Sequence, residues 1–226
     1  MGKRGKAAVA ATAAVVLLVA LLAWWLLRDD EPVPAVAPDP VPTTPTPTPT
    51  VAPPTGPCAV QATTGFEPTR IAIPGVVRRA QVYGVPRTPA GVVGVLPHTD
   101  NQNFAWDLGG VEPGSHEGHV LINTHTWPDG SAMGNRLLDK LQVGATIRLG
   151  DGADVACYRV TKRDEVPAKD GYPGWAATDG PPQMVIVVCS GQRLGPGEWT
   201  HRTLWFADPV GPDGKIVESG NPTPPL

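Results

Sequence analysis

This chain of 226 residues has a net charge of −3 and lacks both metal-ligand spacings and a phosphate-binding loop. Its three cysteines and five histidines show none of the paired short spacings of zinc ligands. No glycine-rich loop followed by lysine offers a phosphate site, and no lysine- and arginine-rich run lies beyond the first thirty residues. The sequence therefore predicts no metal centre, no nucleotide-binding loop and no nucleic-acid partner.

An uncharged, mostly apolar stretch covers residues 7–27, after a basic N-terminal tip and before Arg28-Asp29-Asp30. As a helix it would be about 32 Å long, enough to cross the hydrocarbon core of a membrane and longer than the apolar part of most signal peptides. The basic tip predicts a cytoplasmic N-terminus and an extracellular remainder. We expect residues 1–30 to form this tip and a single-pass signal-anchor helix; a cleaved signal peptide is the alternative.

Residues 31–57 are rich in proline and threonine. Proline removes backbone donors, and the segment offers little to bury, so we expect a disordered spacer here. The remainder, residues 58–226, suits one domain of ordinary size, with a loose tail over residues 209–226.

Short apolar runs separated by turn residues recur through this domain, and no internal repeat is present. The runs cover residues 69–73, 92–96, 119–123, 146–149, 155–160, 184–188 and 203–207. Strand-like runs at this spacing predict an all-β barrel or sandwich. One helix is predicted over residues 133–141, where three leucines fall on one stripe.

The cysteine count is odd, which leaves one reactive or intermolecular thiol in an exported protein. A Cys58–Cys157 bridge would fasten the start of the domain to a β run and leave Cys189 free. The alternative is three unpaired cysteines, with Cys157 simply part of the core.

Cys189 ends the apolar run 184–188, which is typical of a strand buried on both faces. Arg202 follows thirteen residues later and opens the run 203–207, so the thiol and the guanidinium would face each other across the mouth of one hairpin. A nucleophile beside a fixed cation suits acyl chemistry.

A thiol with a pKa near 8.5 needs a proton partner at neutral pH, and imidazole is the usual one. His125 directly follows the run 119–123, at a loop mouth like the one expected for Cys189. The remaining histidines are expected elsewhere: His119 at the opposite end of that strand, His201 on the far face of its own strand, and His98 and His116 in solvent.

The order of these groups resembles the sortases, the cysteine transpeptidases of Gram-positive cell surfaces. His125 precedes Cys189 by 64 residues, and Arg202 follows shortly after. Further segments are similar to the class E and F sortases of high-GC Gram-positive bacteria: residues 68–74, 106–114, 134–137 and 143–147. Val188 stands where the family usually has threonine, and Thr126-Trp127 follows the histidine where Val-Asp is common.

The resemblance implies an eight-stranded barrel with one or two short helices, and no cofactor. It implies cleavage of a Leu-Pro-x-Thr-Gly or Leu-Ala-x-Thr-Gly sorting signal between Thr and Gly. Cys189 would form the thioacyl intermediate, His125 would transfer protons, and Arg202 would hold the substrate or the oxyanion. An amine acceptor, either a peptidoglycan precursor or a lysine, would then take the acyl group. Val188 and Trp199 are the candidate substrate-binding residues.

Other classes fit less well. Papain-like peptidases place the cysteine before the histidine, and L,D-transpeptidases carry a Gly-Cys-x-Arg run that this chain lacks. The alternative outside catalysis is a weak or inactive sortase-like β domain that binds a partner at the cell surface.

Overall fold

The computed structural model describes residues 55–217. The span predicted over residues 7–27 lies outside these residues, as do most of the spacer and residues 218–226 of the tail. Within the described range, no helix is both long enough and apolar enough to cross a membrane.

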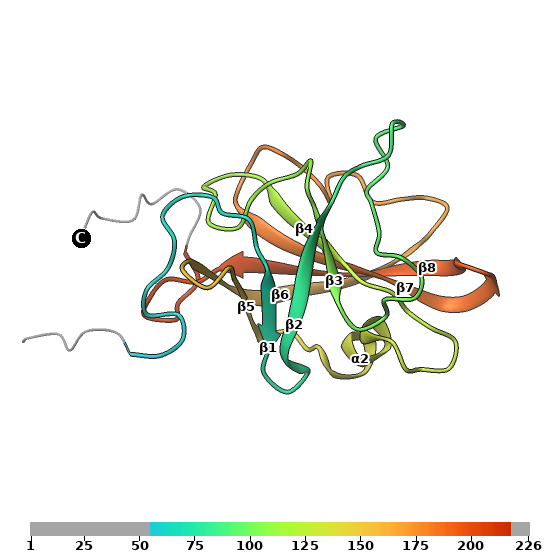
Figure 1. The fold of residues 1–226 in the computed structure, drawn as a ribbon, viewed down its shortest axis with the longest axis horizontal. Coiled ribbons are helices and arrows are strands. Elements are labelled where there is room, and N and C mark those ends of the chain that lie inside the picture. The colour runs from blue at the N-terminus through green and yellow to red at the C-terminus, as the bar shows by residue number, and fades with distance from the viewer. Residues whose placement is uncertain (1–54, 218–226) are drawn as a thin grey trace, which may run out of the picture. The chain divides into compact units, whose positions relative to one another are not determined.

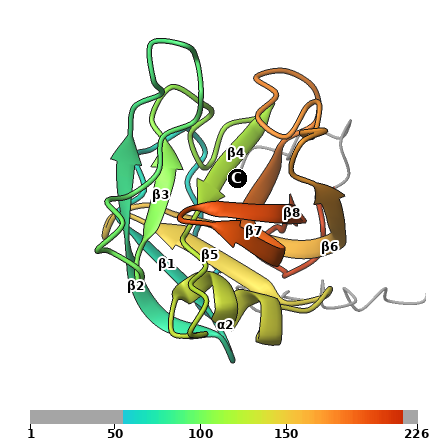
Figure 2. The same ribbon diagram turned by 90° about the vertical axis from the view of Figure 1, so that its right-hand side faces the viewer.

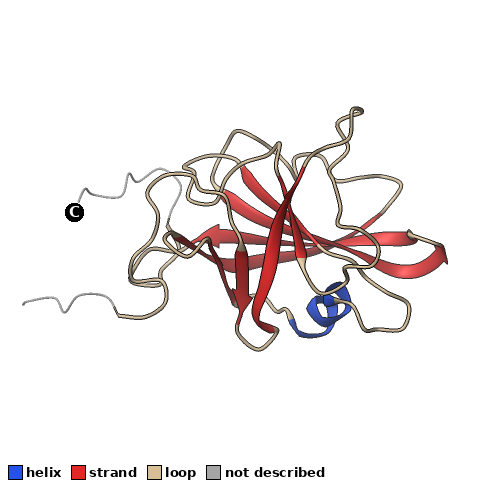
Figure 3. Cartoon of the chain, viewed as in Figure 1, coloured by secondary structure: helices blue, strands red, loops and turns tan. Residues whose placement is uncertain are grey.

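Residues 55–217 contain eight strands and one α-helix (Figures 1 and 3). In chain order these are β1 (Arg70–Ile73), β2 (Val77–Val85), β3 (Phe104–Asp107), β4 (His119–Asn123), α2 (Met133–Lys140), β5 (Thr146–Gly150), β6 (Val155–Pro167), β7 (Gln183–Gly195) and β8 (Glu198–Pro209). The strands close into a barrel in the order β1-β2-β3-β4-β7-β8-β6-β5. The β2–β3 and β4–β7 pairs are parallel and the other pairs antiparallel. The predicted all-β, eight-stranded barrel is confirmed.

Strand β7 is buried on both faces, as its unbroken apolar run predicts. Met184, Ile186 and Val188 point into the barrel core. Val185 and Val187 belong to a second apolar cluster on the outer face. Side chains of β4 and β8 complete that outer cluster, and the β6–β7 loop packs against it. Alternate residues of one strand thus face two different apolar environments.

Helix α2 lies at one end of the barrel (Figure 2). It covers nearly all of the predicted range 133–141, and Met133, Leu137 and the following Leu141 are buried in the main core. The Trp205 indole N–H donates to the Leu141 carbonyl at 3.1 Å, which fastens the helix end to β8. Burial of an apolar stripe therefore holds this short helix in place.

Two parts of the strand prediction were wrong. The run 92–96 lies in the β2–β3 loop, where its carbonyls serve other partners: the Gly94 oxygen accepts from the Asn123 amide at 2.9 Å. A strand ladder would need those same groups. Strands β2 and β3 were missed, because β2 carries adjacent exposed arginines and β3 has only four residues.

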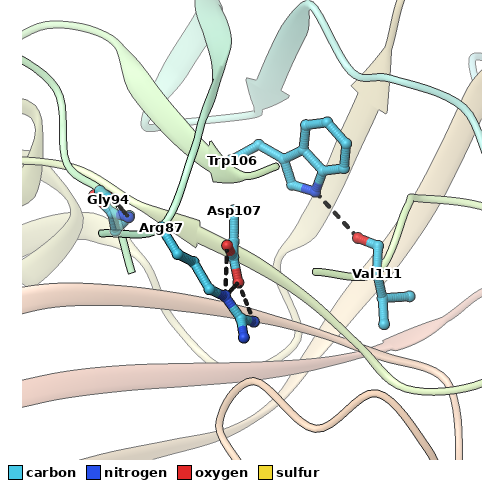
Figure 4. Close-up of polar contacts among 6 residues, drawn as sticks. Arg87, Gly94, Trp106, Asp107 and Val111 are labelled. Carbon is cyan, nitrogen blue, oxygen red and sulfur yellow. Dashed lines mark hydrogen bonds and ion pairs between the residues drawn. The ribbon is translucent and has the colours of Figure 1, made fainter. Parts of the chain in front are cut away.

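The β2–β3 loop, residues 86–103, is fixed where it begins by an ion pair (Figure 4). Asp107, at the end of β3, is fully buried and accepts from the Arg87 Nε at 3.0 and 2.9 Å. A carboxylate without solvent contact needs such a partner. Gly94 packs against Val85 and the Pro86 carbonyl, which leaves no room for a side chain there. These contacts set the path of the loop.

Cys58 and Cys157 form a disulfide that closes a sequence separation of 99 residues, and Cys189 is the free cysteine among residues 55–217. We expect reduction to lower the free energy of unfolding by about 2–5 kcal/mol, because the loop closed is long. That loss corresponds to a fall in the thermal midpoint of roughly 5–20 °C.

Thermal unfolding of the full chain with and without dithiothreitol measures this fall. The Cys58→Ser variant is the control, and reductant should leave its lower midpoint unchanged. Equal midpoints for the oxidised and reduced wild-type chain would contradict the expectation.

Candidate active site

Cys189 and Arg202 lie directly opposite each other in the antiparallel β7–β8 pair. Cross-strand neighbours share a face of the sheet, so both side chains point to the outside of the barrel. The sequence predicts that Cys189 ends its strand, and this prediction is wrong. Strand β7 runs on to Gly195, and the two strands continue as a hairpin arm that turns at Pro196-Gly197 (Figure 1).

A bulge follows the cysteine in this arm. Ser190 pairs with His201 and Arg193 with Trp199, so β7 carries one more residue than β8 between these pairs. Gly191 has φ +76°, the left-handed conformation that such a bulge needs. The ladder is regular through Cys189 and becomes irregular immediately after Ser190.

The guanidinium of Arg202 is held by the backbone of its own strand. Its Nη1 donates to the His201 carbonyl at 2.9 Å and to the Trp199 carbonyl at 3.4 Å. Burial raises the pKa of the Cys189 thiol above its usual value, and the positive charge of Arg202 opposes this rise without cancelling it. The thiol is therefore mainly protonated at neutral pH in the free protein.

His125 follows β4 and is fixed through one ring nitrogen. Its Nε2 lies 2.8 Å from the Leu96 carbonyl oxygen. Because a carbonyl can only accept, Nε2 carries the proton, which leaves Nδ1 as the nitrogen that can take one up. The ring of His98 stands edge-on to His125, with the centroids 5.4 Å apart. The β2–β3 loop thus sets both the tautomer and the orientation of His125.

Thr126 links the histidine loop to the cysteine. Its buried hydroxyl donates to the Cys189 carbonyl at 2.7 Å. The N–H of Gly134 in α2 donates to the His125 carbonyl at 2.8 Å. Asn135 brackets Trp127, accepting from its N–H at 2.9 Å and donating to its carbonyl at 3.0 Å. The start of α2 therefore supports the loop on which His125 lies.

His125, Cys189 and Arg202 line one cavity of about 540 Å³ on the outer face of β4, β7 and β8. The rest of its lining comes from the β2–β3 loop, the β4–α2 loop, the β6–β7 loop and the hairpin arm. The remaining lining residues are Val93, Val95, His98, Leu121, Asn123, Thr124, Thr126, Trp127, Pro128, Trp175, Val187, Val188, Arg193, Gly197 and Trp199. This size and mixed lining suit a short peptide segment.

The two candidate substrate-binding residues occupy different positions. Trp199 lines the cavity from the hairpin arm. Val188 also borders it, but its side chain is only 2% exposed and packs in the barrel core. Sequence reasoning missed Thr126 and Asn135, whose contacts join the His125 loop to β7 and α2.

The other histidines are distributed largely as expected. His116 is exposed, and His119 begins β4, away from the cavity. His201 pairs with Ser190 and bonds Thr200 through Nδ1. His98 is exposed, yet it lines the same cavity as His125. In the described part of the chain, no three His, Cys, Asp or Glu side chains are grouped so as to hold a metal ion.

No protein-family model and no curated protein matches the sequence. Among solved structures, the chain is similar to sortase C1 from Streptococcus agalactiae, with 20% identity over 63% of this chain and 66% of that one, and a TM-score of 0.49. It is also similar to sortase A from Corynebacterium diphtheriae, with 17% identity over 65% and 62% and a TM-score of 0.49. This chain spans slightly less than two thirds of either structure's length.

Arg202→Gln removes the positive charge that lowers the pKa of Cys189, so we expect that pKa to rise further. The rate of Cys189 alkylation by iodoacetamide is measured by mass spectrometry at a series of pH values. In Arg202→Gln this rate should be lower at every pH below the one at which the thiol is fully ionised. The plot of alkylation rate against pH for the wild type should already have its midpoint at a higher pH than that of an ordinary thiol. Arg202→Lys keeps the charge and should shift the curve less. Identical curves for Arg202→Gln and wild type would contradict the charge effect.

Gly134→Ala tests the support that α2 gives to the His125 loop. A methyl group at this position would lie 2.5 Å from the His125 carbonyl oxygen and even nearer to the Thr126 hydroxyl. Helix propensity alone predicts a gain of about 0.5–1 kcal/mol for this change. We expect instead a loss of about 1–3 kcal/mol from overpacking, measured by urea unfolding.

The control for Gly134 is Gly109→Ala. An added Cβ at Gly109 has no neighbour nearer than 3.5 Å. This control should be nearly neutral, and stabilisation by Gly134→Ala would rule out the steric account.

Proposed function

We propose that the protein is a membrane-anchored, extracellular cysteine transpeptidase of the sortase type, similar to classes E and F. The observation that carries this proposal is the convergence of three side chains that are distant in sequence. His125, Cys189 and Arg202 line one cavity, and the thiol lies directly opposite the guanidinium. A nucleophile, a proton carrier and a fixed cation in one cleft are the parts that acyl transfer requires.

The proposed substrate is an extended peptide carrying a Leu-Pro-x-Thr-Gly or Leu-Ala-x-Thr-Gly signal. Val93, Val95 and Leu121 give the cavity apolar walls that suit the leucine and proline or alanine side chains. Trp175 and Trp199 add flat surfaces at the β6–β7 loop and the hairpin arm.

In the first half-reaction, Nδ1 of His125 takes the proton of the Cys189 thiol, and the sulfur attacks the threonine carbonyl. A C–S bond forms and the carbonyl becomes an oxyanion. Within residues 55–217, the Arg202 guanidinium donates hydrogen bonds only through Nη1. Its Nε and Nη2 groups therefore remain to stabilise the negative charge of the oxyanion. The C–N bond to glycine then breaks, His125 returns the proton to the leaving amine, and a thioester remains.

In the second half-reaction, the amine acceptor attacks the thioester and releases the Cys189 thiol, giving a new amide. A peptidoglycan precursor or a lysine side chain would serve as acceptor, and water would give hydrolysis instead. Because burial raises the pKa of Cys189, little thiolate is present at neutral pH. We expect slow turnover at pH 7 that accelerates as the pH rises.

The same raised pKa favours one alternative, a sortase-like domain that binds signal peptides without cleaving them. Both functions use the cavity around Cys189. They differ in whether a covalent thioester accumulates.

The test uses the full chain in neutral detergent with fluorogenic peptides carrying each signal, and triglycine or lysine as acceptor. Cys189→Ala should abolish cleavage, and His125→Gln and Arg202→Gln should each reduce it at least about 100-fold. Lys169→Gln, an exposed change outside the cavity, is the control.

Mass spectrometry should detect a thioester on Cys189 before acceptor is added. Cleavage that persists in Cys189→Ala would overturn the proposal. Peptide binding without cleavage or thioester in the wild type would favour the binding domain.

A further inference from the structure

A second hollow, of about 220 Å³, lies on the outer face of β1, β2 and β5. Its walls carry four arginines, which come from three strands: Arg70, Arg78, Arg79 and Arg148. In the barrel order, β1 is four strands away from β7 in either direction. The hollow is therefore on the side of the barrel opposite the cysteine.

The β1–β2 register explains how the arginines converge. Ile71 pairs with Ala80, and Ile73 pairs with Val77, so Ala72 faces two residues of β2. This bulge leaves both Arg78 and Arg79 exposed, although neighbours in a regular strand point to opposite faces.

On its other side, Ala72 pairs with Arg148 of β5, and Arg70 pairs with Gly150. Ala72, Gly150 and Gly152 also line the hollow, so small residues alternate with the arginines. Side chains of this size leave open the space between the guanidinium groups.

The charge of this hollow is only partly compensated. None of the ion pairs within residues 55–217 involves these four arginines. Arg70 donates through Nη2 to the Asp151 carbonyl at 2.9 Å, and Asp154 is the acidic residue in the lining. Since the whole chain has a net charge of −3, the cluster is a local feature and not part of a general positive charge. Guanidinium groups gathered in this way repel one another and attract an anion.

We propose that this hollow binds a phosphate ester group. The planar guanidinium presents paired N–H donors that match two phosphate oxygens, and several such groups around one anion give charge-assisted bonds from different directions. The alanine and glycine positions let the phosphate approach the sheet. This site is separate from the proposed active site and does not depend on the function proposed there.

Two sources could supply the phosphate: a soluble ester or a phospholipid headgroup. Cys58, the first residue of the domain, lies near the hollow, because it is bonded to Cys157, and Cys157 pairs with Arg148. The sequence predicts a membrane anchor N-terminal to Cys58, so a phospholipid headgroup is one of the two sources. The experiment therefore needs one arm for each source.

Isothermal titration calorimetry with the full chain in neutral detergent provides both arms. The soluble probes are inorganic phosphate and glycerol 3-phosphate. The lipid probe is phosphatidylglycerol in micelles of the same detergent, with phosphatidylcholine as its neutral counterpart. We expect at least one anionic probe to bind, with an affinity that falls as salt is raised.

The Arg78→Gln/Arg79→Gln double variant and the Arg148→Gln variant should each weaken binding about tenfold or more, since each removes charge-assisted bonds. Arg78→Lys/Arg79→Lys keeps the charge but not the paired donors, and should weaken it less. Lys140→Gln/Lys169→Gln removes two charges outside the hollow and should leave binding unchanged. Peptide cleavage should stay at the wild-type level in the arginine variants.

Binding of soluble phosphate alone would identify a soluble ester as the ligand, and binding of phosphatidylglycerol alone would identify the headgroup. Failure of every anionic probe would overturn the proposal. Equal weakening of binding by the Lys140→Gln/Lys169→Gln control would overturn the proposal too, because the net charge of the protein would then explain the loss of affinity. Thermal unfolding of each variant checks that the barrel is intact.

Discussion

The pairing of β7 with β8 is the constraint on which the candidate active site depends. Met184, Ile186 and Val188 must point into the barrel, because their burial forms its core. Strict alternation then places Cys189 on the outer face, opposite Arg202. A slip of one residue would turn the thiol into the barrel and move these three core side chains to the outer face. The register that stabilises the barrel therefore also fixes the proposed nucleophile beside its cation.

The proposed proton carrier is positioned by backbone groups. The Leu96 carbonyl takes the Nε2–H of His125, and the Gly134 N–H binds the His125 carbonyl. Thr126 then joins this loop to the Cys189 carbonyl. These hydrogen bonds fix the His125 ring without placing a charged group beside it. In the free protein, burial and Arg202 are accordingly the causes of the shifted pKa of Cys189. The thiol stays mainly protonated until a substrate or a higher pH changes that balance.

Features with a local cause could be predicted from the sequence, and features made by distant contacts could not. The unbroken apolar run 184–188 and the leucine stripe of the helix at 133–141 are local patterns that long-range contacts do not override. The run 92–96 looks like a strand, yet Asn123 takes one of its carbonyls and His125 another. The extension of β7 past Cys189 was missed because it has two glycines and one apolar side chain, and only pairing with β8 makes it a strand.

Barrel closure gives this protein two chemically different outer faces. Around β7, apolar side chains and three loops enclose the thiol, and burial there opposes its ionisation. Around β1, a bulge and small residues bring Arg78 and Arg79 together with Arg148, which is 69 residues further along the chain. No motif in the sequence marks this cluster, since it arises only when β5 closes the barrel against β1. An anion bound there would lie across the barrel from Cys189, so its charge would be too distant and too screened to disturb the thiol. The fold can therefore hold a cationic surface and a weakly acidic nucleophile without coupling one to the other.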